Sequence, residues 1–178
     1  ELFKGILDSL KGVKLADGAV VFVVSNPVDI LTDLAVDSGV VSDPNRVIGL
    51  GTVLDTARYR SLIADRFGLN ALDVRALMLG EHGDTMVPIL SSATYGGVPL
   101  LSAPDVTEFT RKSGAEVIRL KGGAGRAVGV SIRDVVHAIA LDSDAVLPIS
   151  TRQTGSLGIE GISLSLPTVV GKGGAKSV

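Results

Sequence analysis

The stretch Val20-Val21-Phe22-Val23-Val24-Ser25-Asn26-Pro27-Val28-Asp29 joins an apolar run to a proline turn and the start of a helical pattern. Five apolar, mostly β-branched residues in a row are typical of a strand covered on both faces, as in a parallel sheet. Pro27 suits the first turn of a helix over residues 28–38, and Asn26 can cap it. The stretch therefore predicts an α/β fold. Because ligands bind at the carboxyl ends of parallel strands, Asn26 is equally a helix cap and a candidate ligand residue.

A second strand-to-helix unit follows, in which Val47-Ile48-Gly49-Leu50-Gly51-Thr52 leads into Leu54-Asp55-Thr56-Ala57-Arg58. Its two glycines do not form a dinucleotide fingerprint, because a leucine stands where the third glycine is required. Asp55 and Arg58 are three residues apart, so they project from one face of the predicted helix. Taken alone, this pattern indicates an ordinary exposed ion pair.

A third stretch, Leu79-Gly80-Glu81-His82-Gly83-Asp84, follows an apolar run at residues 74–79 that we interpret as a buried strand. Histidine, with a pKa of about 6.5, both accepts and donates protons near neutrality. A structural histidine in a polar turn is the alternative interpretation. Beside Asp55 and Arg58, however, His82 gains a carboxylate that can orient its ring and a guanidinium that can bind a carboxylate by two hydrogen bonds. Together they predict proton transfer on a small carboxylic acid.

Composition limits the classes of protein that fit. The 178 residues are 46% hydrophobic, which is enough for a sizeable core, and contain no cysteine. A net charge of -2 and 3% aromatic residues argue against nucleic-acid binding. The longest apolar run, Ala19 to Val24, is far shorter than the roughly 20 residues that cross a bilayer, and no signal peptide is recognised. We expect a cytoplasmic protein with no membrane segment.

The remaining elements are predicted from periodicity and turn residues. His137 has no acidic motif around it and is interpreted as a structural or surface histidine. We interpret Gly171 to Gly174 as a frayed tail. The other expectations are helices over residues 2–12, 107–120 and 127–141, an antiparallel meander over residues 86–100, and strands at 145–149 and 162–166.

The motifs Ser25-Asn26-Pro27-Val28-Asp29, Leu54-Asp55-Thr56-Ala57-Arg58 and Gly80-Glu81-His82-Gly83-Asp84, in this order and spacing, resemble those of the NAD-dependent L-lactate and malate dehydrogenase family. The resemblance covers residues 2–171. It implies the end of a Rossmann-type parallel sheet, as a remnant of the NAD-binding domain over residues 1–50, followed by the α+β substrate-binding domain over 51–178. The family's glycine fingerprint and mobile-loop arginine are not found, so we expect the internal or C-terminal portion of a complete enzyme.

The resemblance also implies roles for individual residues. His82 would donate and accept the proton, Asp55 would orient it, and Arg58 would clamp the substrate carboxylate. Asn26 and Ala124 would also contact the substrate. The implied NAD contacts are Val24, Ser25, Asn26 and Leu50.

Arg60 and Arg75 coincide with an intersubunit anion site that activates some bacterial lactate dehydrogenases. Two surface arginines without a partner are the alternative interpretation. No metal site is implied by the resemblance. The implied partners are NAD, a small 2-hydroxy or 2-oxo acid, and further copies of the chain in a dimer or tetramer.

The substrate is less clearly indicated than the reaction. Glu81 and Gly51-Thr52 are more similar to lactate dehydrogenases, whereas Ala124 and the segments 85–88 and 110–112 are more similar to malate dehydrogenases. We favour oxidation of L-lactate to pyruvate, with L-malate to oxaloacetate as the alternative. Two other classes stay open. One is a catalytically silent oligomerisation or binding module, and the other is a metal-dependent hydrolase built on Glu81, His82, Asp84 and His137.

Overall fold

The computed structural model describes residues 1–102, 104–123 and 125–178, and it contains a four-stranded sheet whose strands come from both halves of the chain. Its order is β1-β2-β9-β10, with β1 at Val21–Val23, β2 at Val47–Gly49, β9 at Ser150–Thr154 and β10 at Glu160–Ser165. β1 and β2 run parallel, whereas β9 is antiparallel to both of its neighbours. The predicted α/β fold with a parallel strand pair is confirmed.

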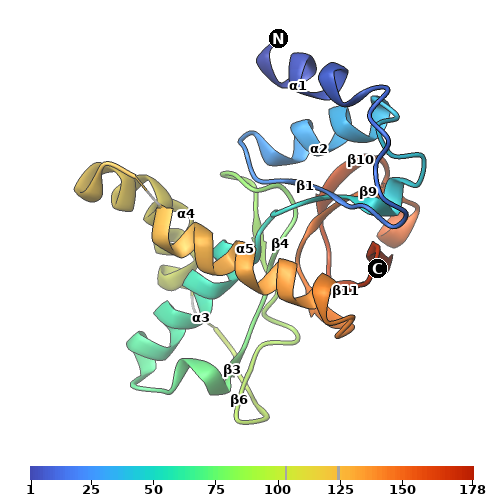
Figure 1. Cartoon of the computed structure of the whole chain (residues 1–178). Coiled ribbons are helices and arrows are strands. Elements are labelled where there is room, and N and C mark those ends of the chain that lie inside the picture. Colours follow the sequence, from blue (N-terminus) through green and yellow to red (C-terminus); the bar gives the residue numbers. More distant parts are fainter. Residues whose placement is uncertain (103, 124) are drawn as a thin grey trace.

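Two helices pack beside this sheet, α1 (Leu2–Leu10) and α2 (Val28–Asp37), and Figure 1 shows them together with β1 near the top of the view. Apolar residues of α1, α2, β1 and β2 form one core cluster, comprising Leu7, Val23, Val28, Ala35 and Val47. The prediction that Asn26 caps α2 was wrong. Pro27 itself occupies the N-cap position in an extended conformation, and no side chain makes a capping hydrogen bond there. Asn26 is instead left exposed at the carboxyl end of β1.

Helix α3 (Val53–Phe67) begins four residues after β2 and carries the Asp55 and Arg58 motif. It ends at Gly68, whose φ of 65° is a left-handed conformation that glycine adopts without a steric penalty. A second core cluster lies under α3 and includes Tyr59, Ile63 and Met78, which are all fully buried.

The segment after α3 contains several short strands instead of the one buried strand expected at residues 74–79. They are β3 (Val74–Arg75), β4 (Met78–Leu79), β5 (Val87–Pro88), β6 (Thr94–Tyr95) and β7 (Val98–Pro99). β4 pairs with β5, whereas β3, β6 and β7 form a separate antiparallel sheet. Gly80 then bridges to Ser165 of β10, so the segment that carries His82 is bonded to the four-stranded sheet.

The C-terminal part contains α4 (Pro104–Lys121), α5 (Gly125–Ala140), β8 (Ala145–Leu147), β11 (Thr168–Gly171) and β12 (Gly174–Ser177). The expected frayed tail was wrong, because β12 pairs with β11 in a sheet of order β12-β11-β8. Gly174 has a φ of 103°, and a side chain there would overlap the carbonyl oxygen of Asn45. Glycine therefore allows the tail to pack against the chain before β2.

The three remaining helical turns are 3₁₀ turns at Pro44–Arg46, Ala71–Asp73 and Ser156–Gly158 within the residues described.

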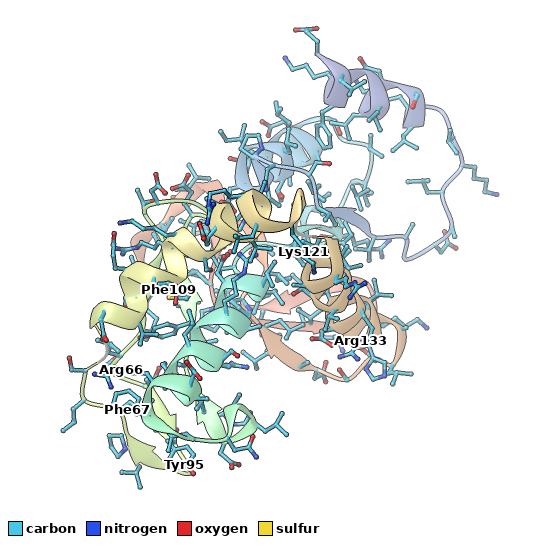
Figure 2. The ribbon with its side chains drawn as sticks, turned by 90° about the vertical axis from the view of Figure 1, so that its left-hand side faces the viewer. Arg66, Phe67, Tyr95, Phe109, Lys121 and Arg133 are labelled. Carbon is cyan, nitrogen blue, oxygen red and sulfur yellow. The ribbon has the colours of Figure 1, made fainter. Side chains whose placement is uncertain are left out.

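Helices α4 and α5 lie beside α3, and α5 crosses the middle of the molecule toward β11 (Figures 1 and 2). Arg66, at the carboxyl end of α3, forms a 3.2 Å ion pair with Asp105 in the first turn of α4 (Figure 2). His137 is exposed on α5, which confirms the surface interpretation. No helix in the part of the chain that is described is long and apolar enough to span a membrane.

Candidate active site

The side chains of Asp55, His82 and Arg58 meet at the start of α3. Nδ1 of His82 lies 2.6 Å from one carboxylate oxygen of Asp55, and Nη1 of Arg58 lies 3.3 Å from the other. Asp55 is 1% exposed, whereas the histidine side chain is 24% exposed and the arginine side chain 16%. The buried carboxylate therefore contacts both side chains, and each of these side chains stays partly accessible.

Two threonines fix the start of α3 against the strand that leads to His82. The hydroxyl of Thr52 donates to the carbonyl oxygen of Met78 at 2.5 Å, and the hydroxyl of Thr56 accepts from the Met78 N–H at 3.0 Å. All three residues are buried. Because a helix and a strand that share buried hydrogen bonds cannot slide freely, these contacts set the distance between Asp55 and His82.

The environment of His82 favours its protonated form. The hydrogen bond with Asp55 raises the pKa of His82, burial opposes this, and the charges of Asp55 and Asp29 raise it further. The positive charge of Arg58 lowers the same pKa. An imidazole held in this way titrates above its usual range, which suits a group that alternately gives and takes a proton.

These residues open into a cavity of about 300 Å³, in which Asn26, Arg58 and His82 share the wall with Arg111 and Gly114 of α4. A smaller recess of about 50 Å³ shares lining residues with this cavity, among them Asn26 and His82. Its apolar wall is made by Val24, Leu50, Leu54 and Val128. The larger volume, with two arginines and a histidine, suits a small carboxylic acid. The apolar recess suits one face of a flat ring.

A third cavity, of about 360 Å³, lies between α3, α5 and β8 and is lined mainly by apolar side chains. It is slightly larger, but neither Asp55 nor His82 lines it. We place the chemistry in the 300 Å³ cavity because titratable groups with specific partners converge there.

The structure brings together most of the residues singled out from the sequence. Asp55, Arg58, His82 and Asn26 share the main cavity, and Val24 and Leu50 line the recess beside it. Ser25 is exposed and lines neither cavity. Ala124 lies outside the described residues.

Arg60 and Arg75 lie apart from this cavity. The Nε of Arg60 donates to the carbonyl oxygen of Ala76 at 2.8 Å. Burial, and then the positive charge of Arg75, lowers the pKa of Arg60. The anion site at these arginines stays a prediction.

Three residues of the site were not assigned a role from the sequence. Arg111 donates from Nη2 at 2.8 Å and from Nε at 3.2 Å to the carbonyl oxygen of Met86, which closes the loop after His82 against α4. Gly114 faces the guanidinium of Arg58, and Asp29 accepts the backbone N–H of His82. Arg111 lies in the segment 110–112, which was compared with malate dehydrogenases but given no role, and Asp29 lies in a recognised motif that gave it no role. No local motif marks Gly114.

Comparisons with known proteins agree with this geometry. Residues 52–178 match the family described as "lactate/malate dehydrogenase, alpha/beta C-terminal domain". The chain belongs to the lactate/malate dehydrogenase family. It is 39% identical over 184 residues to an L-lactate dehydrogenase of Salinibacter ruber, an alignment that covers 96% of the chain. It is also 39% identical over 171 residues to a malate dehydrogenase of Thermomicrobium roseum, with 92% of the chain covered.

Solved structures of L-lactate dehydrogenases share the fold. The minor L-lactate dehydrogenase of Enterococcus mundtii superposes with a TM-score of 0.90 at 30% identity, over 99% of this chain and 59% of that one. The chain spans 57% of the Salinibacter ruber protein and 55% of the Thermomicrobium roseum protein.

The metal-dependent hydrolase interpretation gains no support from the geometry. Within the described residues, Glu81, His82, Asp84 and His137 belong to no group of three or more side chains that could hold a metal ion.

Proposed function

We propose that this chain supplies the substrate-binding and proton-transfer residues of an NAD-dependent L-2-hydroxyacid dehydrogenase. The observation that carries the proposal is the arrangement of His82 and Arg58 on the two oxygens of one buried carboxylate, Asp55, beside a cavity of about 300 Å³. Membership of the lactate/malate dehydrogenase family supports it.

In this proposal Arg58 binds the substrate, and His82 and Asp55 carry out the proton transfer. The Arg58 guanidinium binds the substrate carboxylate through two parallel hydrogen bonds, which orients the hydroxyl carbon toward His82. Neutral His82 accepts the hydroxyl proton, and Asp55 stabilises the imidazolium that forms. In the reverse direction the imidazolium protonates the oxygen of the 2-oxo acid. Acceptance of the hydride from carbon 2 is the chemistry that NAD supplies when it is bound.

The recess beside His82 fits the nicotinamide end of NAD. Its apolar wall can cover one face of a flat ring, and Asn26 belongs to both the recess and the substrate cavity. We assign Val24, Asn26 and Leu50 to the cofactor, and retain Ser25 and Ala124 as proposed cofactor and substrate contacts from the resemblance.

Among the possible substrates, we propose L-lactate as the preferred one and L-malate as the alternative.

We also propose a homo-oligomer, a cytoplasmic location and a domain boundary near residue 51. The match to the family's C-terminal domain begins at residue 52, which supports that boundary. The ratio of kcat/KM for L-lactate to that for L-malate decides the substrate, and light scattering decides the oligomeric state.

Calorimetry tests the proposal directly. NADH is titrated into the chain, and oxamate, a carboxylate analogue of pyruvate, is then added. We expect saturable NADH binding, and oxamate binding that depends on NADH and is lost in Arg58→Gln. A folded chain that binds neither ligand would favour the catalytically silent module.

Activity supplies the second test. Removing a proton-transfer group typically costs about 10²- to 10⁴-fold in rate, so His82→Ala should lower kcat by that factor in the active protein. His137→Ala is the matched control, because His137 is exposed on α5. Turnover near the wild-type level in His82→Ala would refute the assignment.

A further inference from the structure

A second buried carboxylate, Asp29, contacts the segment that carries His82. Asp29 lies in the first turn of α2 and is 8% exposed. It accepts the backbone N–H of His82 at 2.7 Å and the hydroxyl of Ser150 at 2.5 Å. Both partners are donors, which is the arrangement an ionised carboxylate requires.

Asp29 joins three parts of the chain that are distant in sequence. His82 is 53 residues after it, and Ser150, the fully buried first residue of β9, is 121 residues after it. The histidine segment is therefore bound at its backbone by α2 and at its ring by Asp55 of α3. Two fixed points on one residue define where the imidazole lies as well as which way it faces.

The charge of Asp29 also acts on the imidazole. Burial holds the pKa of Asp29 above its usual range, although the hydrogen bonds from Ser150 and His82 and the charge of His82 partly offset this rise. The charge of Glu81 adds to the rise. Asp29 in turn raises the pKa of His82, after the larger contribution of Asp55. The other charged groups around the histidine are Arg58 of α3, Arg111 of α4, and Glu81 and Asp84 of its own segment.

Burying a carboxylate costs free energy unless its bonds compensate, so a buried carboxylate outside the set of reacting groups calls for a reason. We propose that Asp29 is a positioning residue for His82, which anchors the histidine backbone opposite Asp55 and places a second negative charge near the imidazole. The proposal deepens the proposed dehydrogenase function and rests on it for its catalytic meaning. Its structural content can be measured without activity.

The imidazole titration of His82 in the full chain, followed by NMR, is the first test. The chain has two histidines, so a His137→Gln background leaves one titrating imidazole. Asp29→Asn keeps an acceptor for the His82 N–H and removes the charge, and it should lower the pKa of His82. Asp33→Asn is the matched control, since Asp33 lies one turn later on α2 and pairs with Arg152.

An unchanged pKa in Asp29→Asn, or an equal fall in Asp33→Asn, would overturn the electrostatic part. The anchor is tested by hydrogen exchange of the His82 amide, which should be faster in Asp29→Ala and in Ser150→Ala than in the wild type. If a change at Asp29 prevents folding, the Ser150→Ala variant alone tests the anchor. Unchanged exchange in the folded serine variant would overturn the anchor.

Kinetics then separate this proposal from the proposed function. In an active enzyme, Asp29→Asn should shift the pH profile of kcat in the same direction as the NMR titration, with little change in KM. If the chain shows no dehydrogenase activity, the NMR and exchange results still decide whether Asp29 positions His82. A shift in KM alone would contradict a role through the histidine.

Discussion

Replacing Gly114 by alanine should strengthen the fold and weaken substrate binding, because the same glycine sits inside a helix and against the Arg58 guanidinium. A β-carbon built at position 114 lies 3.2 Å from Nη1 of Arg58 and 3.9 Å from Cζ. Ordinary contacts between heavy atoms lie at about 3.5 to 4.0 Å, so the guanidinium must move by a few tenths of an ångström.

Gly114→Ala should therefore raise the free energy of unfolding and, at the same time, weaken the binding of the substrate carboxylate. Alanine is favoured over glycine in a helix interior by about 0.5 to 1 kcal/mol, which corresponds to a rise in Tm of roughly 1–4 °C for a domain of this size. A displaced guanidinium loses the alignment of its two bonds to the substrate carboxylate. Losing one hydrogen bond to a charged group costs about 1.5 to 3 kcal/mol, or roughly 10- to 150-fold in affinity.

The assay pairs urea unfolding with the Kd of oxamate in the presence of NADH. Gly129→Ala is the control, because Gly129 lies inside α5 and a β-carbon there meets nothing within 4 Å. Both variants should gain stability, but only Gly114→Ala should bind oxamate more weakly. Equal oxamate affinity in the two variants, within twofold, would refute the idea that Gly114 makes room for the arginine.

Two further predictions concern pH and the C-terminal hairpin. Asp55→Asn removes the first cause of the raised pKa of His82 and should lower that pKa. The wild type gains stability from this pair below about pH 6.5 and loses it as pH rises through the folded-state pKa, so urea unfolding from pH 5.5 to 9 should show a slope that the variant lacks. Gly174→Ala should lower the free energy of unfolding by more than about 1 kcal/mol, and by more than Gly173→Ala, whose β-carbon meets nothing within 4 Å. Equal losses in the two glycine variants would contradict a close approach of the tail to Asn45.

The local parts of the site could be predicted because their causes are local. Three-residue spacing puts Asp55 and Arg58 on one helical face, and Gly68 ends that helix as its conformational freedom suggests. The prediction of a frayed tail at residues 171–174 was wrong, because the contacts that order this segment include contacts with residues distant in the sequence. β12 is stabilised by pairing with β11 and by close packing beside Asn45, and neither contact leaves a periodic signal in the tail.

The sequence by itself determined the α/β class, the ordered motifs and the chemical groups available to the site. Only the tertiary structure decided that Asp29, His82 and Ser150 meet, and that Arg111 and Gly114 of α4 face the cavity. Periodicity reports how a segment lies on its own helix or strand, whereas these contacts depend on how separate elements pack. The raised pKa of His82 likewise arises from the hydrogen bond with Asp55 and from the carboxylate charges that this packing brings together, against the opposing effect of burial.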